Sequence, residues 1–254
     1  MKRLLGLACV VMLLFAVPAW AGFVNGGFED GTFNGWTKDG GYWGGGSSYN
    51  YSGDPGLSAI MTAGTDALSG NKLQKVLPGY GTYSARINDE LWDAHFSTLS
   101  QKVTWNDDAI YFAFAAVLEE PGNLHPDDAA PHFSITLKNV TTNTVLYSKA
   151  YQVYGLDASW KKGIYGGPND SSAQWWYRDW EIVSINTSAY KGNELLLTLL
   201  ASDCGWGGHG GYAYLDGFGA VRPPDVGAIP EPSTYMLMAA GVAGLVFFRK
   251  RFQK

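Results

Sequence analysis

The chain of 254 residues combines many aromatic side chains with few charged ones. Hydrophobic residues make up 46%, aromatic residues 15% and charged residues 16% of the sequence, which also contains 33 glycines. This composition excludes a disordered, solvating chain, and the low charge argues against a helical bundle or a coiled coil. The formal charge of −5 argues against a nucleic-acid partner, which requires clustered Lys and Arg.

Residues 1–21 have the three parts of a secretory signal peptide. A positively charged start leads into an apolar run over residues 4–17, and Ala-Trp-Ala at residues 19–21 supplies the small side chains that signal peptidase requires. We therefore predict an N-terminal signal helix, export, and cleavage before Gly22. The alternative is a buried or amphipathic first helix, which a run that is apolar all round disfavours.

The C-terminal segment, residues 229–254, also has three parts in a fixed order: a Pro-Glu-Pro motif, an apolar run over residues 235–248, and a basic cluster. The motif is Pro230, Glu231 and Pro232, and the basic cluster is Arg249, Lys250 and Arg251. The apolar run would be about 21 Å long as a helix, which spans a bilayer of about 30 Å with local thinning and snorkelling basic side chains. We predict a transmembrane helix with its basic cluster in the cytoplasm.

This tripartite arrangement resembles the PEP-CTERM sorting signal. The resemblance implies a Gram-negative bacterium that makes exopolysaccharide, and an exosortase as a partner that cuts near the motif. It also implies transient anchoring in the inner membrane, with the body outside the cytoplasm, before delivery to the cell envelope or extracellular matrix. An ordinary single-pass anchor is the alternative.

The body between these segments, residues 22–228, is acidic and has a single cysteine. It contains 12 Lys and Arg against 22 Asp and Glu, a formal charge of −10. Such a body repels anionic polymers and can hold divalent cations through its carboxylates. Cys9 leaves with the signal peptide, so Cys204 has no partner for an internal disulfide. We expect Cys204 to be a small buried side chain, with a reactive or intermolecular thiol as the alternative.

Alternating hydrophobic residues predict several short strands in this body. Residues 110–118 are apolar on both faces, which is typical of a central strand, and residues 133–137 alternate apolar and polar side chains. Further alternating segments cover residues 99–103, 195–199 and 212–221.

Turn signals separate these strands. Residues 141–143 (Thr-Thr-Asn) predict a hairpin turn, and the glycine-rich stretches 40–46, 53–56 and 205–211 predict loops. Many short strands in one undivided body favour an all-β fold, an antiparallel β-sandwich.

The two edges of the body resemble jelly-roll carbohydrate-binding modules and galactose-binding-like domains. The opening segment is Asn-Gly-Gly-Phe-Glu-Asp-Gly at residues 25–31, and the closing strand carries Tyr-Leu-Asp at residues 214–216. The resemblance implies a jelly roll with a structural Ca²⁺ held by Glu29 and Asp216. Backbone carbonyls near Asn25 and Gly31 would have to complete the ligand set. The alternative is that both carboxylates lie in surface turns.

The body contains more tryptophans than one sandwich core needs, and flat aromatic rings can stack on sugar rings. We assign Trp36 and Trp105 to the core. The expected carbohydrate-binding residues are Trp43, Trp92, Trp175, Trp176, Trp206 and His209. Packing in the core or between loops is the alternative for part of this set. A loop cluster of His125, Asp127, Asp128 and His132 lacks the tight ligand spacing typical of a zinc site.

No nucleophile elbow is present, and the adjacent carboxylate pairs would point to opposite faces of a strand, so no catalytic residue is expected. We therefore predict an exported, non-catalytic module that binds extracellular polysaccharide. The first alternative is a self-associating structural protein of the biofilm matrix without a sugar pocket. The second is a polysaccharide hydrolase of an unrecognised kind.

Overall fold

The computed structural model of the chain describes residues 22–122, 125–154, 157–168 and 171–225. The predicted signal helix, the C-terminal membrane helix, the Pro-Glu-Pro motif and the basic cluster lie outside these residues. No helix within the described ranges has the length and apolar character needed to cross a bilayer.

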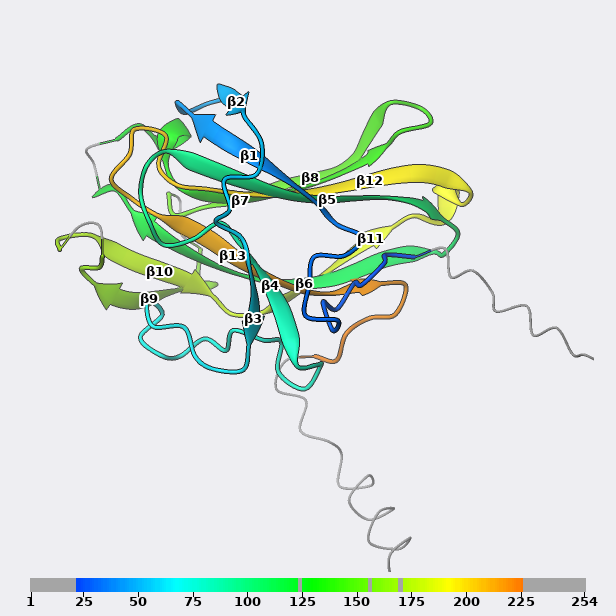
Figure 1. Ribbon diagram of the computed structural model, residues 1–254, viewed down its shortest axis with the longest axis horizontal. Coiled ribbons are helices and arrows are strands. Elements are labelled where there is room, and N and C mark those ends of the chain that lie inside the picture. The colour runs from blue at the N-terminus through cyan, green and yellow to red at the C-terminus, as the bar shows by residue number, and fades with distance from the viewer. Residues whose placement is uncertain (1–21, 123–124, 155–156, 169–170, 226–254) are drawn as a thin grey trace, which may run out of the picture.

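The described residues form two antiparallel sheets that lie face to face (Figure 1). The first sheet has the order β2-β1-β5-β12-β7-β8, with β1 Thr37–Trp43, β2 Tyr49–Tyr51, β5 His95–Trp105, β7 His132–Asn139, β8 Thr144–Gln152 and β12 Asn193–Ser202. The second has the order β3-β4-β13-β6-β10-β9, with β3 Ala59–Thr62, β4 Tyr83–Ile87, β6 Ala109–Glu120, β9 Trp160–Tyr165, β10 Gln174–Arg178 and β13 Gly211–Gly219. Strand β11, Glu181–Asn186, also pairs with β6, and two 3-10 helices, Asp127–Ala129 and Ser188–Tyr190, lie in connections. The predicted all-β antiparallel sandwich is confirmed.

The strand that the sequence predicts as central, β6, pairs with β13 on one side and with β10 and β11 on the other. Its inner face, including Phe112 and Phe114, packs into the core between the sheets. The predicted hairpin turn also forms between β7 and β8, where Asn143 adopts a positive φ of 57°. A residue with a short polar side chain tolerates this conformation.

The main core fills the space between the sheets with aliphatic and aromatic side chains from both inner faces. Leu99, Ile135 and Leu197 from the first sheet face Phe114 of the second and are fully buried. Trp36 and Trp105 belong to this core, as the sequence predicts. Burying one such side chain stabilises the fold by roughly 1.5–3 kcal/mol.

A second apolar layer covers the outer face of the second sheet. Trp175, Tyr212 and Tyr214 project from this face and pack against Leu73 and Leu77, which belong to the connection between β3 and β4. Within this layer the buried carboxylate of Asp66 accepts hydrogen bonds from the hydroxyls of Tyr212 (2.6 Å) and Tyr214 (2.7 Å). The outer face of this sheet is therefore closed to solvent over its central strands β6, β10 and β13.

The prediction of a loop over the glycine-rich residues 40–46 is wrong for its first half, because β1 continues to Trp43. The glycines permit close strand packing there instead. A Cβ atom on Gly41 would lie 2.1 Å from the carbonyl oxygen of Asn50 on β2. The stretch 53–56 contains no strand, as predicted, and the predicted loop 205–211 is confirmed except at Gly211, where β13 begins.

The sandwich has two distinct ends, visible at the left and right of Figure 1. The loops that follow β1, β4, β6, β9 and β12 meet at one end, which we call the loop end. At the other, the terminal end, the opening segment packs against the end of β13. There Phe28 and Trp36 contact Phe218, with the ring centroids of Trp36 and Phe218 4.7 Å apart.

His132, at the start of β7, is buried in a neutral hydrogen-bonded setting. Its Nδ1 lies 2.8 Å from the hydroxyl of Ser202, and its Nε2 lies 2.8 Å from the hydroxyl of Tyr49. Burial lowers the pKa of the His132 imidazole from 6.5 to about 4, against a weaker opposing effect of the Ala130 carbonyl. The folded protein therefore keeps this side chain uncharged well below neutral pH.

We predict that this burial makes the protein less stable in mild acid. Between pH 6.5 and pH 4 the unfolded chain protonates His132 and the folded chain does not, so the free energy of unfolding falls as the pH falls. The loss attributable to His132 is at most about 3 kcal/mol. Urea unfolding at pH 7, 5.5 and 4.5 measures it, and His132→Gln, which cannot titrate, should show a smaller loss. An equal loss in both proteins would contradict this assignment.

Candidate functional site

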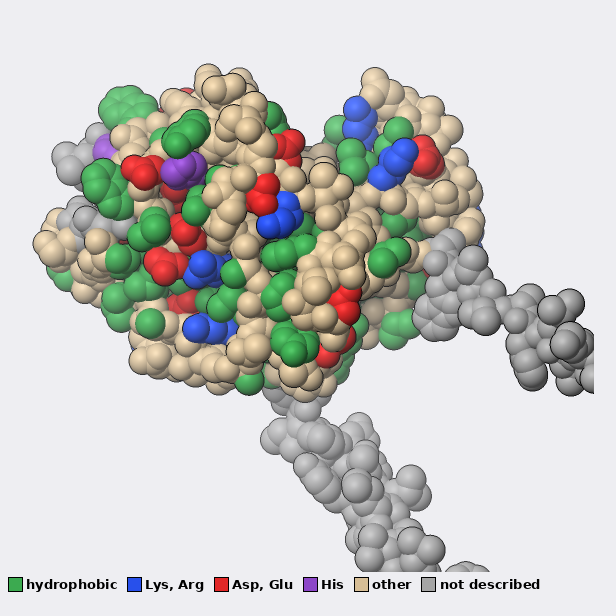
Figure 2. All heavy atoms as spheres, viewed as in Figure 1, with side chains coloured by type: hydrophobic (Ala, Val, Ile, Leu, Met, Phe, Trp, Pro, Cys, Tyr) green, Lys and Arg blue, Asp and Glu red, His purple; other side chains and the backbone are tan. Residues whose placement is uncertain are grey.

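Exposed aromatic side chains gather at the loop end. The described residues include five aromatic side chains that are at least 49% exposed: Tyr42, Tyr51, Trp92, Tyr165 and Trp206. All five lie on the loops of this end or on the strand ends beside them. Figure 2 shows hydrophobic side chains and histidines on the surface of this end, at the left of the view.

Several of these aromatic side chains are held by contacts with neighbouring rings. The ring of Tyr42 lies 4.4 Å from that of His95, measured between centroids, and Tyr51 contacts Phe96 edge-on at 4.8 Å. The ring centroid of Trp206 lies 5.7 Å from that of His125. Supported rings lose little conformational entropy when a ligand stacks on them.

A pocket of about 300 Å³ lies among the loops of the same end. Its lining combines the aromatic ring of Tyr165 with polar groups of Glu120, Gln174 and His209. Glu120 is oriented by a 2.6 Å hydrogen bond that it accepts from Nε1 of Trp176. An apolar wall with a few fixed polar groups is the usual form of a small-ligand site.

Two of the six expected carbohydrate-binding residues cannot stack on a sugar, because their rings are buried. Trp43 is only 3% exposed, packs against Tyr49 and donates a hydrogen bond from Nε1 to the carbonyl of Asp203 (2.9 Å). Trp175 is fully buried in the layer that covers the outer face of the second sheet. We correct the prediction for Trp43 and Trp175 to structural roles.

The other four expected residues all lie at the loop end but differ in exposure. Trp92 and Trp206 are exposed. Trp176 is half-buried, with Nζ of Lys162 5.4 Å from its ring centroid, and His209 is buried but lines the pocket.

The sequence prediction missed three exposed tyrosines. Tyr42 and Tyr165 each stand beside a glycine, as Trp43 and Trp206 do, so the same local pattern could have marked them. The third, Tyr51, lies on β2 opposite Gly41, between the polar residues Asn50 and Ser52.

Glu29 and Asp216, the expected calcium ligands, lie close together at the terminal end. A Cβ atom on Gly27 would lie 3.5 Å from Cγ of Glu29 and 3.7 Å from Oδ1 of Asp216. Glu29 accepts hydrogen bonds from the backbone amides of Thr82 (3.0 Å) and Tyr83 (3.1 Å). Both side chains therefore border Gly27, and the Glu29 carboxylate is held by two backbone amides.

The surroundings of Asp216 fit a cation ligand. Its carboxylate is buried, Oδ1 accepts a 2.7 Å hydrogen bond from the amide of Gly217, and Oδ2 has no hydrogen-bond partner. Burial raises the pKa of Asp216 to about 8; the charge of Glu29 adds to this, and the Gly217 amide opposes it. The Asn25 carbonyl already accepts hydrogen bonds from the Phe28 amide and from Nε1 of Trp36. The ligands for a cation at this place would therefore be the carboxylates of Glu29 and Asp216.

The cluster of His125, Asp127, Asp128 and His132 is divided by the fold. His132 is buried in the first sheet, whereas Nδ1 of His125 lies 2.8 Å from Sγ of Cys204. Cys204 is buried, as expected.

Burial raises the pKa of the Cys204 thiol to about 11. The Trp206 amide opposes this rise, while the charges of Asp203 and Glu119 add to it. Because the thiolate is the reactive form of cysteine, the raised pKa disfavours the alternative that Cys204 is a reactive thiol.

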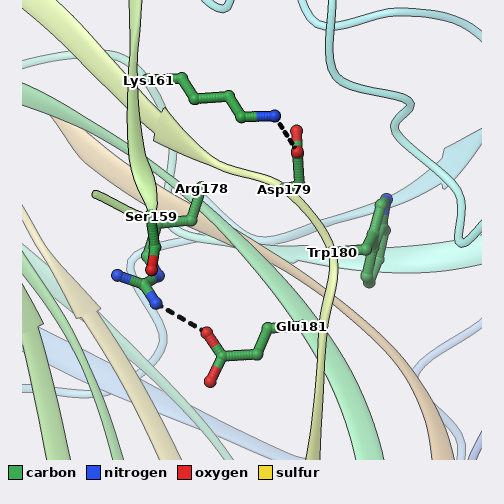
Figure 3. Close-up of a pocket in the computed structure, with 6 residues that line it drawn as sticks. All are labelled: Ser159, Lys161, Arg178, Asp179, Trp180 and Glu181. Carbon is green, nitrogen blue, oxygen red and sulfur yellow. Dashed lines mark hydrogen bonds and ion pairs between the residues drawn. The ribbon is translucent and has the colours of Figure 1, made fainter. Parts of the chain in front are cut away.

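A further pocket of about 260 Å³ lies beside β9, β10 and β11, and its charges are already paired. In Figure 3, Lys161 points toward Asp179 and Arg178 points toward Glu181, at 2.7 Å from Nη2. Arg178 also pairs with Asp157 and lies over the Tyr151 and Trp160 rings. We interpret this pocket as a structural ion-pair network.

Comparison with known proteins identifies the C-terminal segment and gives distant structural neighbours. Residues 228–251 match the PEP-CTERM protein-sorting motif. None of the curated proteins compared with the chain matches it.

Among solved structures, the chain is similar to TmCBM61 in complex with β-1,4-galactotriose, at 14% identity over 78% of this chain and 96% of that one, with a TM-score of 0.41. It is also similar to CBM27-1 of Caldicellulosiruptor saccharolyticus in complex with mannohexaose, at 14% identity over 79% and 96%, with a TM-score of 0.38. A third is the K1 cleaved adhesin domain of Lys-gingipain from Porphyromonas gingivalis W83, at 11% identity over 78% and 96%, with a TM-score of 0.36. The protein is thus an antiparallel β-sandwich followed by a PEP-CTERM sorting motif.

Proposed function

We propose that this protein is exported, processed by an exosortase, and binds extracellular polysaccharide through the aromatic side chains of its loop end without acting on it chemically. The observation that carries the proposal is that all five exposed aromatic side chains of the described residues lie at one end of the sandwich. Aromatic rings stack on the C–H faces of sugars, and the polar groups of the adjacent pocket can accept or donate hydrogen bonds to hydroxyls.

The charge of the body limits the class of polysaccharide. With a formal charge of −10 over residues 22–228, the protein repels uronic acids and sulfated or phosphorylated sugars. Glu120, beside Tyr165 in the pocket, adds a carboxylate at the site itself. We therefore propose a neutral polysaccharide as the ligand.

The chain leaves the sandwich at the end opposite this surface. After β13 the chain folds back, so that Pro223 lies against Gly217 at the terminal end, and the sorting motif begins at residue 228. A protein held at the inner membrane through its sorting segment would carry the loop end on the far side of the sandwich. This arrangement suits a domain that captures polymer while it is anchored and after it is released.

Self-association is the second candidate function, because exposed aromatic side chains can also contact another copy of the chain. Substitution of the exposed aromatic side chains distinguishes the two functions. It should remove the retention on polysaccharide if the protein binds sugar, and it should remove the oligomers if the protein self-associates.

We predict that Trp206→Ala combined with Trp92→Ala weakens binding to neutral polysaccharide at least tenfold. Losing one buried aromatic contact costs roughly 1.5–3 kcal/mol, and 1.4 kcal/mol corresponds to about tenfold in affinity. Affinity electrophoresis of the full chain in gels containing galactan, mannan or xylan measures the retention. Val145→Ala, which alters an exposed apolar side chain on β8 far from these loops, is the matched control.

Unchanged retention in the double variant would overturn the proposal. Absent retention of the parent protein on every neutral glycan, together with oligomers that the double variant loses, would establish self-association in its place.

We also propose that Glu29 and Asp216 hold a structural Ca²⁺ at the terminal end. The supporting observations are that both side chains border Gly27, that the charge of Glu29 acts on Asp216, and that Oδ2 of Asp216 is buried without a hydrogen-bond partner. A cation between them would offset the repulsion of the like charges and would fasten the opening segment to the last strand. The ion would have a structural role and take no part in chemistry on the sugar.

We predict that saturating Ca²⁺ raises the thermal midpoint of the full chain by about 5–10 °C and that a chelator reverses the rise. Ligand at about 100 times its dissociation constant contributes about 2.7 kcal/mol, and each kcal/mol shifts the midpoint by about 2–4 °C in a domain of this size. Asp216→Asn should lose the calcium-dependent shift, whereas Asp225→Asn, an exposed carboxylate beyond the last strand, should keep it. A thermal midpoint that changes with neither calcium nor chelator would contradict the proposed calcium site.

A further inference from the structure

Two histidines and the single cysteine of the body come together at the loop end. His125 follows β6, whereas Cys204 and His209 both follow β12, so the three side chains belong to two loops. One ligand atom from each side chain lies within 4.8 Å of the others. Nδ1 of His125 is 2.8 Å from Sγ of Cys204, and the rings of His125 and His209 lie 4.9 Å apart at an angle of 77°.

The backbone of the loop after β12 holds its two members in this position. The amide of Cys204 donates to the carbonyl of His209 at 2.8 Å, which closes the loop on itself. Gly207 and Gly208 adopt positive φ values of 76° and 94°, so the turn between the two ligand residues needs residues without a side chain. The spacing of Cys204 and His209 is thus built into a hydrogen-bonded turn.

Further hydrogen bonds join this loop to the one that carries His125. The amide of Gly205 donates to the carbonyl of Ala129 at 2.8 Å. The hydroxyl of Tyr154 donates to the carbonyl of Gly122 and, at 3.4 Å, to that of His125. A backbone hydrogen bond between the two loops and the Tyr154 hydroxyl therefore hold the segments that carry these side chains.

We propose that His125, Cys204 and His209 form a binding site for Zn²⁺. Zinc binds thiolate at about 2.3 Å and imidazole nitrogen at about 2.0–2.1 Å, so two ligands of one tetrahedral ion lie roughly 3.5 Å apart. The three atoms lie close enough to reach that spacing by side-chain rotation. As the zinc–sulfur bond forms, the thiol proton passes to solvent.

The donor set separates this site from the calcium site at the other end of the sandwich. Ca²⁺ prefers oxygen ligands, whereas one thiolate and two imidazoles suit a borderline-soft cation. Three protein ligands leave a fourth position for water or an outside donor. Because Trp206 lies beside His125, the ion would fix the loops that carry this exposed ring. Zinc binding by these three side chains does not depend on whether the loop end binds polysaccharide.

The test uses the full chain in detergent, without a histidine tag, stripped of metal and then equilibrated with Zn²⁺ or Co²⁺. We expect one Zn²⁺ per chain that millimolar Ca²⁺ does not displace, and a thiolate-to-metal charge-transfer band with Co²⁺. Cys204→Ala should abolish the band, and His125→Gln should weaken zinc binding about tenfold or more. His95→Gln, a histidine of the same end outside the cluster, should leave both readouts unchanged.

The second variant, His125→Gln, controls for misfolding of Cys204→Ala. His125 is only half-buried, so its replacement disturbs the fold less than replacement of the buried Cys204. Zinc uptake by a chain whose Co²⁺-loaded form has no thiolate charge-transfer band, or zinc uptake that survives in both Cys204→Ala and His125→Gln, would overturn the proposal. Failure of the parent chain to retain Zn²⁺ would overturn it as well. Selective uptake of copper in place of zinc would refute the choice of metal.

Discussion

The structure depends on shielding both faces of β6 from water. Its inner face completes the core between the sheets, and the alanine and valine side chains of its outer face lie under the connection between β3 and β4. Because that connection also covers Trp175, Tyr212 and Tyr214, the second sheet has no open aromatic face. Exposed aromatic side chains are left at the loop end, and this constraint places the proposed binding surface there.

The two ends of the sandwich divide the remaining tasks. At the terminal end, aromatic packing among Phe28, Trp36 and Phe218 joins the first and last segments, and the side chains of Glu29 and Asp216 both border Gly27. At the loop end, backbone hydrogen bonds between loops hold the groups that could contact a ligand. Features that stabilise the fold are thereby separated from features that could vary with the ligand.

Local sequence patterns predicted the strands better than the site. The two apolar faces of residues 110–118 and the Thr-Thr-Asn turn at residues 141–143 report local geometry, so β6 and the β7–β8 hairpin could be predicted. Tryptophan burial depends on distant partners instead. Trp175 and Trp206 both have polar or glycine neighbours, yet only Trp175 lies under a segment about 100 residues earlier in the chain.

The most direct test is hydrogen–deuterium exchange of the full chain with and without a neutral polysaccharide that the chain retains. The account predicts that slowed exchange is confined to the loops after β1, β4, β6, β9 and β12, with the terminal end unchanged. Slowed exchange centred on the outer face of the first sheet, or at the terminal end, would contradict the claim that the loop end is the binding surface.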